Sequence, residues 1–184
     1  RRAGKRLRLL CLVPALLLVW QGCERLLEGW QIAPLAAYVH AEWWGRGAAP
    51  PLTTVLAVEP GRADGRAWSA YGQAALTLAE RSEDKAARAR YLDMAEAATR
   101  KALRLGPAQA AAWARLALIS VNRAEPDLAA LALARSLALA PVGPNLAWPR
   151  VKLGLYLRPL LGGPARAGIA ADVARLWQQP PSAG

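Results

Sequence analysis

The stretch AAAWARLALISV, residues 110–121, decides how the fold of this chain is interpreted. It consists mostly of alanine and other helix-forming residues, and Arg115 is its only charged residue. Alanine is the strongest helix former, and the rest of the 184-residue chain is also rich in alanine, with no phenylalanine and few β-branched residues. The composition therefore predicts an all-α fold, in which residues 110–121 form one helix of a repeated unit.

A pattern of large and small residues occurs twice along the chain. One copy is Trp68-x-x-Tyr71-Gly72, followed by Ala95, Thr99, Ala102 and Pro107. The other is Trp113-x-x-Leu116-Ala117, followed by Ala129, Leu133, Ser136 and Pro141. The large residues are expected to fill the space between helices, and the small ones to let two helices approach closely. Each proline ends a hairpin, because proline cannot continue the helix before it.

This pattern, with its two prolines 34 residues apart, resembles the tetratricopeptide repeat (TPR) family over residues 52–141. The resemblance implies helix pairs stacked into a short α-solenoid whose concave face binds a partner protein. It also implies that one side of the first helix of each repeat faces this groove. The residues concerned are Arg66, Ser69, Gln73, Thr77, Ala111, Ala114, Leu118 and Asn122. The last four are mostly small or apolar, which favours a groove filled by a partner helix.

Capping and helix-breaking residues predict the other helices. Ser82, Glu83 and Asp84 indicate the start of a long helix that ends before Pro107. Its core-facing stripe is expected to be Ala87, Tyr91, Met94, Ala95, Ala98, Ala102 and Leu105. A further helix is expected from Pro126 to about residue 138.

Residues 142–184 depart from the repeat pattern and are expected to form a capping helical hairpin and a tail. Asn145 and Pro149 open its first helix, which runs towards Arg158. The second helix is expected from Pro164 to Gln178. Its apolar residues are Ile169, Val173, Leu176 and Trp177.

The N-terminal part has the pattern of a membrane anchor. Residues 1–8 form a basic tip, and the apolar pattern that follows predicts a transmembrane helix over residues 9–33, amphipathic in its second half. Residues 34–51 are expected to form an interfacial helix and a linker. The positive-inside rule places the N-terminus of this single-pass protein in the cytoplasm, and the repeat domain in the periplasm beyond the inner membrane. The residues expected at the membrane interface are Arg8, Trp20, Trp30, Trp43 and Trp44.

Two other interpretations of this segment stay open. A cleaved signal peptide would need an A-x-A-like arrangement of small residues after the apolar run, which VWQGC at residues 19–23 does not supply. A lipoprotein would use Gly22 and Cys23, although Trp20 then stands where a small aliphatic residue is preferred.

Nucleic-acid binding and catalysis are not expected. Five of the eleven net positive charges lie in the basic tip directly before the apolar run, which is typical of a topology signal, and the other six are spread over helices that also carry acidic residues. The chain contains no G-x-S-x-G, Walker-type, H-E-x-x-H or C-x-x-C-H motif. Its one histidine, His40, lies in an aromatic segment, and two cysteines, Cys11 and Cys23, build no zinc cluster. We therefore expect no enzyme activity, no cofactor and no metal.

Two functions are consistent with this organisation. One is a non-enzymatic, membrane-anchored periplasmic TPR scaffold or accessory subunit. Its partner would be a protein, expected to be an integral membrane subunit of an envelope complex such as one for polysaccharide synthesis or export, and its anchor would contact membrane lipid. The other is a saccharide- or lipid-binding periplasmic module that uses tryptophans as platforms: Trp43, Trp44, Trp148 and Trp177.

Overall fold

The computed structural model of the protein describes residues 33–34, 37–38, 51–57, 59–61 and 64–178. The regular secondary structure of these residues is entirely helical, which confirms the predicted all-α fold. Within these ranges, no helix has both the length and the apolar character that crossing a bilayer requires. The predicted anchor, residues 9–33, lies almost wholly outside the described residues.

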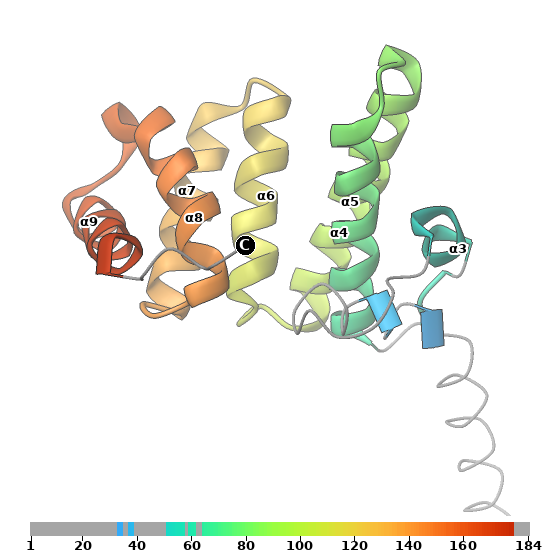
Figure 1. The fold of residues 1–184 in the computed structure, drawn as a ribbon, viewed down its shortest axis with the longest axis horizontal. Helices are drawn as coiled ribbons and strands as arrows, with labels where there is room; N and C mark the ends of the chain where they lie inside the picture. Colours follow the sequence, from blue (N-terminus) through green and yellow to red (C-terminus); the bar gives the residue numbers. More distant parts are fainter. Residues whose placement is uncertain (1–32, 35–36, 39–50, 58, 62–63, 179–184) are drawn as a thin grey trace, which may run out of the picture.

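The described helices pack mainly as consecutive hairpins, in which α4 pairs with α5, α6 with α7, and α8 with α9 (Figure 1). A short helix, α3, precedes the first hairpin. The elements are α3 (Leu52–Leu56), α4 (Gly65–Arg81), α5 (Lys85–Leu105), α6 (Ala110–Asn122), α7 (Pro126–Leu139), α8 (Pro144–Tyr156), the 3-10 turn η1 (Arg158–Leu160) and α9 (Gly163–Gln178).

Three of the helices, α4, α5 and α7, begin at residues typical of a helix N-terminus. Asp64 accepts hydrogen bonds from the backbone N–H groups of the first turn of α4. Asp84 does the same for α5, so the helix start predicted at residues 82–84 is confirmed, with Asp84 as its cap. Pro126 is at the first position of α7, as predicted, where its missing N–H has no intrahelical partner to lose.

Small residues hold α4 and α5 close together. A Cβ on Gly72 would lie 2.8 Å from Thr99 Oγ1 and 3.3 Å from the Ala95 carbonyl oxygen. Ala75 on α4 and Ala102 on α5 are each 0% exposed. The two helices therefore meet almost backbone to backbone, as the small residues in the sequence predicted.

Side chains of the second and third hairpins form one apolar cluster. It includes Leu116 on α6, Leu133 on α7, Leu153 on α8 and Ile169 on α9. At the other end of the stack, Tyr38 and Val55 pack with alanines on the outer face of α4. The C-terminal hairpin is thus part of the main core, while α3 and Tyr38 close the N-terminal end.

A buried pair that no sequence pattern predicted joins α8 to α9. Arg150 and Asp172 are both 0% exposed, with Arg150 Nη1 3.9 Å from Asp172 Oδ2. Arg150 also donates to the Ser136 hydroxyl and carbonyl and to the Ala140 carbonyl. Arg175 donates to the other oxygen of Asp172. Burial raises the pKa of the Asp172 carboxyl, and the two guanidinium groups oppose that shift. The pair fixes the C-terminal hairpin against the end of α7.

Two predicted stripes are only partly correct. On α5, Leu105 is 43% exposed, because it is the last residue of the helix and lies opposite the first residue of α4, Gly65. Thr99 and Leu103 are buried instead, because α5 packs between α4 and α6. On α9, Val173 and Trp177 are exposed and Ile169 is buried, since only one side of this last helix has neighbours.

The two repeat tryptophans also differ from each other. Trp68 is 6% exposed, its Nε1 donates to the Gly61 carbonyl, and Lys101 Nζ lies 3.7 Å from its ring centroid. Trp113 is only partly buried at the edge of the C-terminal cluster, and its Nε1 donates to the Pro107 carbonyl. The two positions match in sequence, but neighbouring segments cover only the first ring fully.

The close contact between α4 and α5 predicts the effect of enlarging Gly72. Gly72→Leu should lower the free energy of unfolding by about 1–3 kcal/mol, because the new side chain would overlap Thr99. Unfolding of the full-length chain in a mild detergent, followed by circular dichroism, measures this. Gly163→Leu is the matched control, because a Cβ there meets nothing within 4 Å. Equal losses in both variants would contradict the close contact.

Candidate partner-binding groove

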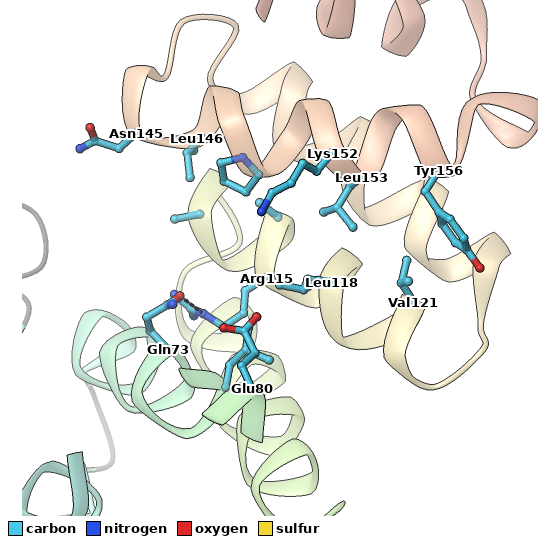
Figure 2. A pocket seen from close by; sticks show the side chains of 14 residues that line it. Gln73, Glu80, Arg115, Leu118, Val121, Asn145, Leu146, Lys152, Leu153 and Tyr156 are labelled. Carbon is cyan, nitrogen blue, oxygen red and sulfur yellow. Dashed lines mark hydrogen bonds between the residues drawn. The ribbon is translucent and has the colours of Figure 1, made fainter. Parts of the chain in front are cut away.

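A groove runs along the side of the stack where α4, α6 and α8 face one another. It consists of two adjoining cavities of about 530 and 570 Å³. Both are lined by residues from all three helices, and they share Gln73, Ala111, Arg115, Asn145 and Leu146. Figure 2 shows the first cavity, with α8 across from α4 and α6. The volumes are of the size that ligand-binding clefts have.

The floor of the first cavity is mainly apolar. Ala111, Ala114, Leu118 and Val121 follow one another on α6 at the three- and four-residue spacing of a single helix face. Leu146 and Leu153 on α8 face this side of α6 across the cavity (Figure 2), and Pro149 on α8 also lines it. The first cavity therefore offers an apolar trough between two helices.

The second cavity has more polar groups around its rim. Arg66, Ser69 and Gln73 come from α4, Gln109 precedes α6, and Asn145 comes from α8. Tyr38 closes this cavity at the N-terminal end. Its hydroxyl lies 3.4 Å from Thr77 Oγ1.

The structure brings most of the predicted groove residues together. Arg66, Ser69 and Gln73 line the second cavity, Ala111 lines both, and Ala114 and Leu118 line the first. Thr77 and Asn122 line neither. The Thr77 hydroxyl donates to the Gln73 carbonyl within α4, and Asn122 accepts from Arg88 on α5 and donates to the Leu118 carbonyl.

Arg115, at the junction of the two cavities, was not among the predicted groove residues. It is 7% exposed, its Nε donates to Gln73 Oε1 at 3.0 Å, and its Nη1 donates to the Ser69 hydroxyl at 3.2 Å. Burial lowers the pKa of this guanidinium to about 10, with a smaller opposing influence from Tyr38. Arg115 thus connects α6 to α4 and places a desolvated positive charge in the groove.

The contribution of α8 was also missed. Asn145, Pro149, Lys152 and Tyr156 line the first cavity at spacings of four, three and four residues, which is one face of a helix. That spacing was visible in the sequence. Residues 142–184 were interpreted only as a cap, and the structure shows that the cap also supplies one wall of the groove.

The membrane-interface residues predicted from the sequence lie outside the described residues: Arg8, Trp20, Trp30, Trp43 and Trp44. Within the described part of the chain, no group of three or more histidine, cysteine or acidic residues could hold a metal ion. The chain matches no protein-family model and no curated protein sequence.

The burial of Arg115 predicts an unusual response to its removal. Arg115→Met should leave the free energy of unfolding within about 1 kcal/mol of wild type or raise it, because replacing a desolvated charge by an apolar side chain of similar size is often neutral or stabilising. Urea unfolding of the full-length chain in detergent measures this change. A loss above about 2 kcal/mol would instead show that Arg115 is mainly a structural link between α4 and α6.

Proposed function

We propose that the protein is a non-enzymatic, membrane-anchored TPR-like scaffold that holds a segment of a partner protein in the groove between α4, α6 and α8. The observation that carries this proposal is the pair of adjoining cavities whose walls come from three successive hairpins. A groove shared between hairpins suits an elongated ligand such as a helix or an extended peptide.

The repeat pattern supports the TPR part of the proposal. The pattern residues Gly72, Thr99 and Ala102 lie at the contact between α4 and α5. Leu116, Ala117, Ala129 and Leu133 belong to one core cluster of α6 and α7. The first helix of each pair lines the groove, as it does in a stack of this family.

The sequence of the N-terminal part supports the membrane setting. A basic tip followed by the apolar run over residues 9–23 is typical of an anchor whose N-terminus stays in the cytoplasm. The groove-bearing domain would then lie in the periplasm close to the inner membrane. An integral membrane subunit of an envelope complex is the kind of partner that this setting favours, and the protein would serve it as an accessory subunit.

A saccharide- or lipid-binding role is the second candidate. Trp148 on α8 is 59% exposed and Trp177 on α9 is 89% exposed. The contacts of Gly154 with Ile169 and of Arg150 with Asp172 make α8 and α9 antiparallel, so both tryptophans lie at the same end of this hairpin. Lys152 Nζ is 5.5 Å from the Trp148 ring centroid. Exposed indole rings with polar neighbours can stack on sugars or contact headgroups.

A charge placed on the groove floor tests the scaffold. Leu118→Lys should abolish co-purification of the partner from gently solubilised membranes, because an unpaired ammonium group buried against an apolar segment costs several kcal/mol. Leu118 is only partly buried in the free protein, so the domain should still fold. The proteins retained by a tagged full-length chain, identified by mass spectrometry, give the result.

Leu131→Lys is the matched control, since Leu131 is 56% exposed on the outer helix α7 and lines neither cavity. It should retain the partner. A partner that is retained by Leu118→Lys but lost by Trp148→Ala would argue against the groove and for the second candidate.

The proposed topology has its own test. A reporter that is active only in the periplasm should be active when fused after Gly184, and one that is active only in the cytoplasm should not. Neutral replacement of Arg1, Arg2, Lys5, Arg6 and Arg8 together should weaken this orientation, because they form the cytoplasmic basic tip. The reverse pattern of reporter activity would rule out a periplasmic groove.

A further inference from the structure

The two cavities meet at a buried positive charge whose described hydrogen-bond partners are neutral. Arg115 bonds to an amide oxygen of Gln73 and a hydroxyl of Ser69. No carboxylate in the described part of the chain lies within ion-pair distance of it. In Figure 2 the bond from Arg115 to Gln73 crosses the floor of the groove from α6 to α4.

Two other arginines, one buried and one at the surface, have acidic residues beside them. Arg150 is fully buried and has Asp172 beside it, together with two backbone carbonyls. Arg123 lies at the surface and pairs with Asp93 and Glu96. Arg115 is buried, as Arg150 is, but it has no described acidic partner. A buried charge without a partner of opposite sign lowers the stability of a folded protein.

The guanidinium of Arg115 keeps hydrogen-bonding capacity for a ligand. A guanidinium has five N–H donors in a planar fork, and the bonds to Gln73 and Ser69 use one on Nε and one on Nη1. The residue lines both cavities. Its fork therefore lies where a ligand in either cavity reaches it.

The groups around Arg115 favour an anion over a cation or a neutral ligand. Arg66, Gln109 and Asn145 line the second cavity, where no acidic residue is among the lining side chains. Glu80 lines only the first cavity. It follows Gln73 by seven residues on α4, which is about 10 Å along the helix axis. Lys152 lies across the first cavity on α8.

We propose that the junction of the two cavities is a carboxylate-binding site, in which Arg115 pairs with an aspartate or glutamate side chain of the partner segment. The inference rests on the proposed function and names the chemistry of the partner that the groove selects. Two parallel N–H···O bonds from the fork match the two oxygens of a carboxylate, and Ser69 and Gln73 hold the fork in place.

A protein carboxylate fits this groove better than a phosphate group does. Only one cation at the junction is buried, since Arg66 and Lys152 are both exposed. One guanidinium balances the single charge of a carboxylate. The alanine and leucine floor on α6 beside it suits the apolar residues that flank an acidic residue on a partner helix.

Arginine side-chain NMR of the full-length chain in a neutral detergent tests the site directly. The Nε–H resonance of Arg115 is assigned by its loss in Arg115→Lys, and it is then followed during titration with butyrate, butyramide or inorganic phosphate. Butyrate stands in for a glutamate side chain, and butyramide is its neutral isostere. Butyrate should shift the resonance saturably, with half-saturation at a concentration at least about tenfold below that of the other two probes.

Each other result would overturn the proposal. Saturation by phosphate but not by butyrate would assign the site to a phosphate group such as a lipid headgroup. No saturable shift with any probe would make Arg115 a link between α4 and α6 only.

The outcome is separable from that of the scaffold proposal. If Leu118→Lys releases the partner while butyrate leaves the Arg115 resonance unchanged, the groove binds a partner without a carboxylate. If butyrate binds while Leu118→Lys retains the partner, Arg115 is an anion site on a surface that the partner does not use.

Discussion

The architecture depends on how closely α4 and α5 approach each other. Backbone contact at Gly72, with Thr99 and Ala95 opposite, leaves no room for a side chain between the two helices. Dispersion contacts fall off within an ångström of the optimal distance, so such a contact is gained only when small residues stand on both helices in register. Because these small residues face α5, the neighbouring face of α4, which carries Ser69, Gln73 and Leu76, lines a groove with α6 and α8.

The two buried arginines of the described residues have different surroundings: Arg150 is part of the core, and Arg115 faces the groove. Arg150 has Asp172 beside it and donates three hydrogen bonds to Ser136 and Ala140, so it fixes α8 and α9 against the end of α7. Arg115 has neutral partners and faces both cavities. An arginine beside an acidic residue, such as Arg150, thus helps to hold the fold together. An arginine with only neutral partners, such as Arg115, keeps a positive charge that we propose binds a ligand.

The groove combines these features into a consistent functional picture. The groove has an apolar trough proposed to receive a helix, a buried guanidinium where its two cavities meet, and one wall formed by the C-terminal hairpin. Under the proposed function, this arrangement would select among protein ligands, because a buried charge rejects ligands that leave it unpaired. The exposed indoles of Trp148 and Trp177 at one end of the last hairpin add a second surface that the groove does not use.

The sequence by itself determined the helical fold, the boundaries of α5, α6, α7 and α9 to within a few residues, and the small residues at the contact between α4 and α5. These features follow from local preferences: alanine content, aspartate caps and proline breaks act within one or two turns. Through the TPR-like pattern it also placed six of the twelve α4 and α6 residues that line the groove: Arg66, Ser69, Gln73, Ala111, Ala114 and Leu118. Only the tertiary structure decided which side chains lack or find neighbours. Several features depend on contacts between segments far apart in the chain, which no local pattern encodes. They are the burial of Arg115, the pair of Arg150 with Asp172, the exposure of Leu105 and Trp177, and the groove wall formed by α8.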